Sequence, residues 1–145
     1  MGDPNESKGP QKDVEILVID DDQDRLEETL EILGGFGYKG TSVACAKTEK
    51  DAMGLVENEN PHLAVVDANL TRRLEEEGLR VIRAISQQHK DCVVICITSQ
   101  ATKGLGPRAL RTGARDYIDC NWPYVNWVEF LKQRIDLWLG YLDTK

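Results

Sequence analysis

Short apolar runs rich in β-branched residues alternate along the chain with segments of helical periodicity, and this alternation constrains the fold more than any other feature. The runs are residues 14–20, 39–46, 62–68, 92–99 and 115–120. Three of them are apolar almost throughout, which is typical of parallel strands buried on both faces. Between the runs, apolar residues recur at helical spacing, as at Leu26, Leu30 and Leu33. Strand–helix units in succession predict an α/β fold with a parallel sheet and helices on both faces.

The domain organisation follows from length and from the N-terminal composition. A chain of 145 residues is long enough for one domain with one real core. Residues 1–13 contain no apolar residue after Met1, so burial cannot offset the entropy lost on ordering them. We therefore expect a disordered tail over residues 1–13 and one domain over residues 14–145.

Composition excludes several classes of function and location. No apolar run reaches the roughly 18 residues of a membrane span, and the N-terminus has no signal-peptide core. The four cysteines lack zinc-ligand spacing and indicate core thiols in a reducing compartment. A net charge of −7 gives no general attraction to nucleic acid or to anionic membranes. We expect a cytoplasmic protein that binds neither directly.

Carboxylates follow two of the predicted strands at the point where each strand ends. Asp20, Asp21 and Asp22 come after the first apolar run, and Asp67 ends the third. The carboxyl ends of parallel strands form the edge of a sheet where ligands bind. Two carboxylates about 5 Å apart repel by roughly 3 kcal/mol at an effective dielectric near 20. The cluster therefore predicts a bound cation, and oxygen ligands alone favour partly hydrated Mg²⁺.

A simpler interpretation of the same acids remains open. Carboxylates are also good helix caps, so Asp20, Asp21 and Asp22 could serve the first helix and Asp67 a turn. Thr98 and Ser99 end the fourth run and also have two interpretations. A hydroxyl at a strand end can cap the next turn, or it can hold a phosphoryl oxygen.

The sequence has no Gly-rich phosphate loop and no nucleophile elbow, which disfavours a hydrolase or nucleotide enzyme.

From Val14 to Leu142 the chain resembles the receiver domain of two-component response regulators. Four segments carry the resemblance in the family's order and spacing: ILVIDDD at 16–22, LAVVDANL at 63–70, ITS at 97–99 and GARDYI at 113–118. The resemblance implies a flavodoxin-like, five-stranded parallel sheet of order 2-1-3-4-5.

The resemblance also implies a function and a set of site residues. Asp67 matches the phosphoacceptor, Thr98 the hydroxyl that contacts the phosphoryl group, and Tyr117 the aromatic switch residue. Mg²⁺ is expected at Asp20, Asp21, Asp67 and the backbone carbonyl of Asn69. The implied protein is a signalling phosphoacceptor and not an enzyme beyond its own phosphoryl transfer. A histidine kinase or phosphotransfer protein would supply the group, and the fourth and fifth helices would bind an output partner or a second copy.

The chain departs from the family in one charge and one loop. The family has a Lys directly before a Pro after the fifth strand, whereas residues 117–123 read YIDCNWP and contain no Lys. Neutral Cys120 or Asn121 cannot replace a charge-assisted contact to a phosphoryl group. Candidate substitutes are Lys103, Arg72 and Arg73. Residues 71–78 form a longer polar loop than the family's, without its usual Pro. These departures keep a second interpretation open, a receiver-like interaction module that works without phosphorylation.

The last helix is apolar around most of its circumference. Val128, Leu131, Ile135, Leu139 and Leu142 suffice to pack on a sheet. Phe130, Leu137 and Tyr141 form a second stripe, with Trp127 and Trp138 between the two. The stripe is either part of a wide core-facing surface or an interface for a partner or a second copy.

Overall fold

The computed structural model describes residues 14–35, 41–71 and 76–144. The predicted tail, residues 1–13, lies outside the described residues, and so do Arg72 and Arg73. Strands and helices alternate through the described chain, with these bounds: β1 (Val14–Ile19), α1 (Gln23–Gly35), β2 (Thr41–Ala46), α2 (Glu49–Asn58), β3 (Leu63–Asp67), α3 (Glu77–Gln88), β4 (Val93–Thr98), α4 (Leu105–Thr112), β5 (Asp116–Asp119) and α5 (Trp127–Asp143).

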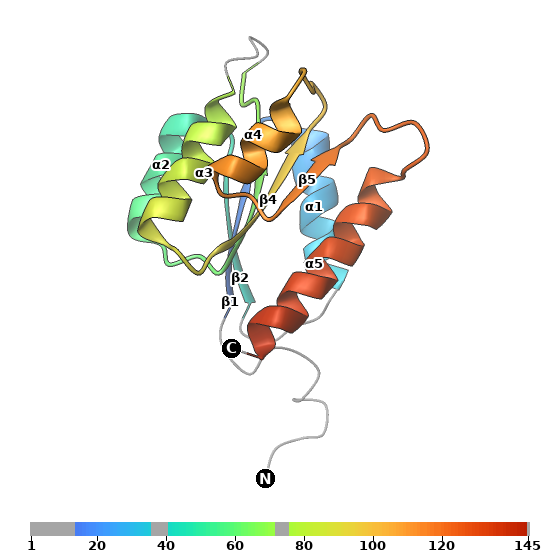
Figure 1. Cartoon of the computed structure of the whole chain (residues 1–145). Helices are drawn as coiled ribbons and strands as arrows, with labels where there is room; N and C mark the ends of the chain where they lie inside the picture. The colour runs from blue at the N-terminus through green and yellow to red at the C-terminus, as the bar shows by residue number, and fades with distance from the viewer. Residues whose placement is uncertain (1–13, 36–40, 72–75, 145) are drawn as a thin grey trace, which may run out of the picture.

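The strands form one parallel sheet of order β2-β1-β3-β4-β5, which confirms the expected α/β fold and strand order. Helices α1 and α5 cover one face of the sheet, and α2, α3 and α4 cover the other (Figure 1). Each face therefore has its own apolar layer. Val66, Ile82 and Leu105 belong to one layer, and Ile95 and Leu131 belong to the other.

The central strands are buried because helices lie on both sides of them. All residues of β3 and β4 are buried, which accounts for the nearly continuous apolar sequence of both. Parallel pairing places Ile19 of β1 opposite Val66 of β3, and Asp67 opposite Ile97 of β4. The carboxyl ends of β1, β3 and β4 consequently meet at one edge of the sheet.

The second apolar stripe of α5 is largely used inside the molecule. Phe130 is partly buried against the core and meets the Trp122 ring edge to face at 5.9 Å. Tyr141 is also partly buried there and meets Trp138 at 5.6 Å. These contacts favour the core interpretation for Phe130 and Tyr141, whereas Leu137 is 51% exposed.

None of the helices in the described part of the chain combines the length and the apolar character that crossing a membrane requires.

The cysteines differ sharply in accessibility, which makes a first prediction. Cys45 is exposed, whereas Cys92 and Cys96 are buried and burial raises the pKa of both thiols. Because only an accessible thiolate reacts readily, we expect iodoacetamide to modify Cys45 in the folded protein and Cys92 and Cys96 only in denaturant. Peptide mass spectrometry after timed labelling measures this order. Equal labelling of Cys45 and Cys96 without denaturant would contradict the packing of β4.

Candidate functional site

Three predicted acids meet at the carboxyl ends of β1 and β3. Asp20, Asp21 and Asp67 each contribute a carboxylate oxygen to a group whose atoms lie within 4.8 Å of one another. Asp20 and Asp67 are buried, and Asp21 is exposed at the rim. The pairing of β1 with β3 brings the acids together, because it aligns the ends of two strands that are far apart in sequence.

A buried arginine lies between these carboxylates. Arg25 is only 9% exposed, and its guanidinium donates to both oxygens of Asp20, from Nε to Oδ2 at 3.0 Å and from Nη2 to Oδ1 at 2.9 Å. Nη2 also donates to Oδ2 of Asp67 at 2.6 Å. Nη1 donates to the hydroxyl of Ser99 at 2.6 Å. One cation thus joins the ends of β1, β3 and β4.

The start of α1 explains how Arg25 reaches the sheet edge. Oδ1 of Asp20 accepts the backbone N–H of Asp22 at 2.9 Å, and Oδ1 of Asp22 accepts the backbone N–H of Arg25 at 3.0 Å. The helix therefore begins directly over the end of β1. Helical side chains lean toward the N-terminus of their helix, so Arg25 in the first turn leans back over that edge. The capping interpretation of the acids holds for Asp22.

The electrostatics of the site reflect burial and the excess of acid. Burial and the neighbouring Asp20 carboxylate raise the pKa of Asp67, while Arg25 acts in the opposite direction. Burial alone would lower the pKa of Arg25, but hydrogen bonds and charge from Asp20, with charge from Asp67, raise it above its ordinary value. Arg25 stays protonated, and one guanidinium does not neutralise three carboxylates.

The segment after Asp67 is fixed by its backbone. Oδ1 of Asp67 accepts the N–H of Asn69 at 3.0 Å, and Oδ1 of Asn69 accepts the N–H of Glu76 at 3.0 Å. The amide nitrogen Nδ2 of Asn69 is buried and has no hydrogen-bond partner in the described structure. A buried donor without a partner carries a free-energy cost that an incoming anionic oxygen would relieve.

The site opens into a small cavity of about 70 Å³. Its lining consists of Asp21, Asp22, Arg25, Asp67, Asn69, Ser99 and Gln100. Thr98 is fully buried, and its Oγ1 accepts the N–H of Gln100 at 3.0 Å, which is the turn-capping arrangement. In this structure Ser99, and not Thr98, is among the residues that line the cavity, and the Ser99 hydroxyl accepts from Arg25.

Tyr117 lies outside this cavity, on β5 between the sheet and α4. A Cβ added to Gly106 of α4 would be 3.1 Å from the Tyr117 ring, so that ring packs closely on the helix. The Tyr117 ring also meets Trp122 at 6.2 Å in an edge-to-face arrangement. The structure thus brings the acids and Asn69 together, whereas neither predicted switch residue is part of the cavity lining.

Sequence reasoning missed the cation that the structure places at the acids. Lys103 is exposed in the turn before α4, and Arg72 and Arg73 lie outside the described residues. Asn121 uses its amide to donate to the backbone carbonyl of Ser99 at 2.7 Å. Arg25 was not among the expected substitutes, but it is the cation that lies buried between Asp20 and Asp67. The available signal was its place in the first turn of a helix that begins directly after the acidic triplet.

The donor set suits a hard divalent ion, because three carboxylate oxygens converge without histidine or cysteine. Arg25 would compete with such an ion, since it already binds two of these three carboxylates. The three predicted carboxylates therefore lie together, and in this structure two of them are paired with an arginine.

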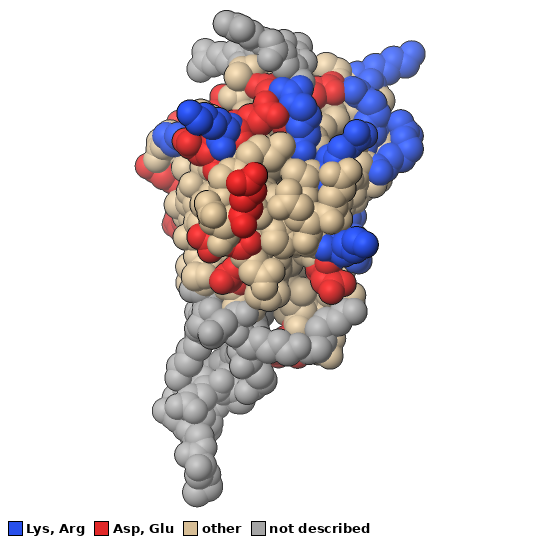
Figure 2. Space-filling view, turned by 90° about the vertical axis from the view of Figure 1, so that its left-hand side faces the viewer, with Lys and Arg blue, Asp and Glu red and all other residues tan. Residues whose placement is uncertain are grey.

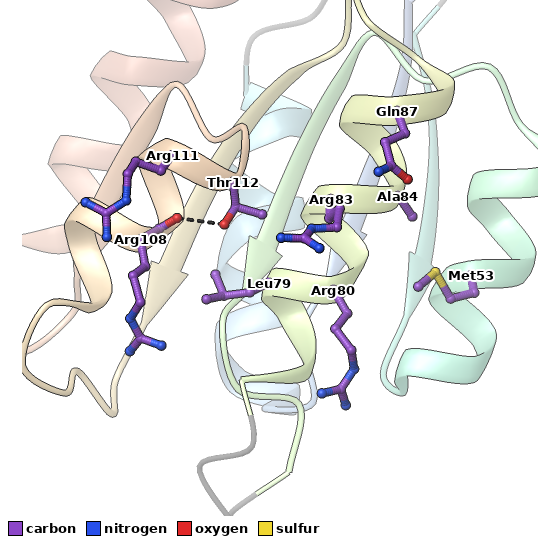
Figure 3. A pocket seen from close by; sticks show the side chains of 9 residues that line it. All are labelled: Met53, Leu79, Arg80, Arg83, Ala84, Gln87, Arg108, Arg111 and Thr112. Atoms are coloured by element: carbon purple, nitrogen blue, oxygen red, sulfur yellow. Dashed lines mark hydrogen bonds between the residues drawn. The ribbon is translucent and has the colours of Figure 1, made fainter.

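A larger groove of about 750 Å³ lies elsewhere, between α2, α3 and α4 (Figure 3). Arginines from α3 and α4 line it, with Met53 and Leu79 among its apolar residues. Arg80 pairs with Glu49, and Arg108 of α4 pairs with Glu76. Basic side chains gather along one side of the face shown in Figure 2. The groove contains none of the predicted site residues.

Comparison with known proteins gives consistent matches. The family model for the response regulator receiver domain matches residues 16–123. Response regulator MprA of Mycobacterium sp. (strain KMS) is 30% identical over 105 residues, which cover 72% of this chain and 43% of MprA. The transcriptional regulatory protein ZraR of Escherichia coli (strain K12) is 29% identical over 105 residues, which cover 72% of this chain and 22% of ZraR. The match therefore spans less than half the length of either relative.

Solved structures with a similar fold are receiver domains. A CheY-like response regulator receiver domain protein from Methanospirillum hungatei JF-1 superposes with a TM-score of 0.75 at 27% identity, over 92% of this chain and 98% of that one. The BeF3-activated DrrB receiver domain superposes with a TM-score of 0.71 at 25% identity, over 89% of this chain and 99% of that one.

Proposed function

This chain belongs to the response regulator receiver domain family of two-component systems, and we propose that within it Asp67 accepts a phosphoryl group. The observation that carries the proposal is the convergence of Asp67 with Asp20, Asp21 and the cation Arg25 around a small cavity. Phosphoryl transfer depends mainly on positioning and on stabilising charge, and a carboxylate held beside a cation meets both needs.

The proposed step is an in-line transfer from a phosphohistidine of a kinase or phosphotransfer protein. A carboxylate oxygen of Asp67 forms the new P–O bond as the P–N bond breaks, and the histidine nitrogen leaves with the electron pair and then takes up a proton. Both oxygens of Asp67 accept a hydrogen bond, Oδ1 from the backbone N–H of Asn69 and Oδ2 from the side chain of Arg25. We assign Oδ2 as the attacking atom, because a side chain can move away from it more readily than the backbone can. Arg25 and the unpartnered Nδ2 of Asn69 would donate hydrogen bonds to the phosphoryl oxygens.

Divalent metal fits the same site. Asp20, Asp21, Asp67 and the backbone carbonyl of Asn69 would hold Mg²⁺. When bound, the ion would supply further neutralisation of the phosphoryl charge.

The proposed output is a change on the side of α4 and α5. Glu76 links the acceptor segment to α4, since its backbone N–H binds Asn69 and its carboxylate binds Arg108. Thr98, at the end of β4, and Tyr117, whose ring packs on Gly106 of α4, are proposed as the switch residues. A shift along these contacts would alter the surface offered to an output partner or a second copy. We place this signalling in the cytoplasm.

Incubation with Mg²⁺ and acetyl phosphate tests the proposal, with intact-mass measurement as the readout. We expect one phosphoryl adduct on the wild-type chain and none on Asp67→Asn. Asp119→Asn is a matched control, because Asp119 also ends a strand but does not line the cavity, and it should be labelled like the wild type. An adduct retained by Asp67→Asn would contradict the assignment of the acceptor.

The second candidate function is an interaction module that works without phosphorylation. The 2.6 Å pair between Arg25 and Asp67 favours it, because this contact already satisfies the acceptor oxygen. The two candidates separate in the same experiment. No adduct under any phosphodonor condition, together with unchanged partner binding by Asp67→Asn, would support the module and overturn phosphorylation.

A further inference from the structure

We propose that Arg25 is the resident cation of the acidic site and that a divalent ion binds there only by displacing its guanidinium from Asp20 and Asp67. Arg25 would then determine how tightly this chain binds metal. The inference rests on the proposed function for the identity of the metal site, but it concerns a residue for which the family resemblance gave no role.

The hydrogen bonds of the two buried carboxylates carry the argument. Both oxygens of Asp20 accept from Arg25, and Oδ1 of Asp20 also accepts the N–H of Asp22. Oδ2 of Asp67 accepts from Arg25 and Oδ1 from the N–H of Asn69. Each oxygen of the two buried acids therefore accepts at least one hydrogen bond, and three of these five bonds come from Arg25. A metal ion that uses both acids would compete with the guanidinium for the same oxygens, so we infer that it replaces part of the Arg25 contacts.

Charge leads to the same conclusion. The guanidinium is nearly buried, and an arginine keeps its charge in proteins, so it stays a cation beside an incoming ion. A divalent ion held by the same carboxylates would lie close to the guanidinium, and two positive charges repel strongly where water is excluded. Arg25 is nevertheless among the residues that line the cavity, and its Nη1 is bound to Ser99 and not to an acid, so one of its contacts does not depend on the two carboxylates. Displacement from the two carboxylates is therefore possible without unfolding α1.

Substitution of Arg25 by Gln removes the charge and keeps a polar side chain. Titration with Mn²⁺, followed by the electron paramagnetic resonance signal of the free ion, measures the affinity directly. We expect Arg25→Gln to bind Mn²⁺ at least ten times more tightly than the wild type, and the added change Asp20→Asn to abolish that gain. Arg134→Gln is the matched control, since Arg134 also pairs with an aspartate, Asp116, but lies outside the site. Its affinity should equal that of the wild type.

A second variant guards against misfolding. Arg25→Lys keeps one charge but loses the planar fork that spans two carboxylates, so it should bind Mn²⁺ more tightly than the wild type by a smaller factor. Affinities of Arg25→Gln and Arg25→Lys that do not exceed that of the wild type would overturn the inference. No phosphodonor is present in this titration, so a failure of phosphorylation at Asp67 would leave its result unchanged and the two proposals can fail separately.

Discussion

Replacement of Gly78 by alanine is expected to lower the free energy of unfolding by about 3 kcal/mol, because the added methyl group has no space. A Cβ on Gly78 would lie 1.8 Å from the carbonyl oxygen of Asp67 and 2.8 Å from Cα of Ala68. Both are backbone atoms at the end of β3, and neither can rotate aside. Urea unfolding followed by tryptophan fluorescence measures the change.

The cause of this expected loss is steric and not conformational. Gly78 has no positive φ, so its backbone is one that alanine adopts readily, and helix propensity alone would favour alanine by roughly 0.5–1 kcal/mol. Gly54 in α2 provides the control, because a Cβ there meets nothing within 4 Å. Gly54→Ala should therefore leave stability equal or slightly higher. If Gly78→Ala unfolded at the same urea concentration as the wild type, the close approach of α3 to β3 would be wrong.

The fold could be predicted from local patterns because burial on both faces leaves a clear mark on a parallel strand. The predicted strand at 62–68 contains the observed β3, Leu63–Asp67, and a similar match holds for the others. The start of α2 is of the same local kind, since Thr48 accepts the N–H of Asp51, three residues further on, at 3.1 Å. These features depend on residues that are near neighbours in sequence.

The site could be predicted only in part, because its contacts depend on side-chain reach across the sheet. Strand ends fix where Asp20 and Asp67 lie, so their proximity followed from topology. Arg25 stands in a run of charged helix residues, and such a run usually forms a solvated face. Only the packing of α1 over β1 shows that this side chain turns inward. Thr98 and Ser99 illustrate the same limit, since sequence could not decide which hydroxyl would face the cavity.

Removal of the Arg25 charge should also reveal its contribution to stability. Arg25→Gln leaves Asp20 and Asp67 buried without their cation, and breaking a buried ion pair from one side costs about 3 kcal/mol. We expect a loss of this size in metal-free urea unfolding. Arg80→Gln, which removes an arginine from the more exposed pair with Glu49, should cost less than about 1 kcal/mol.

A double-mutant cycle shows whether this loss comes from the stranded carboxylates. If it does, Asp67→Asn should raise the stability of Arg25→Gln, because it removes one of the two uncompensated charges, whereas in the wild type it should not be stabilising. Independent effects of the two substitutions would mean that Arg25 stabilises α1 through packing and not through Asp67. Coupling would instead support a single electrostatic unit formed by Arg25, Asp20 and Asp67. In that case a substitution of Arg25 that weakens the unit should tighten metal binding and lower metal-free stability together, because both properties depend on the same carboxylate oxygens.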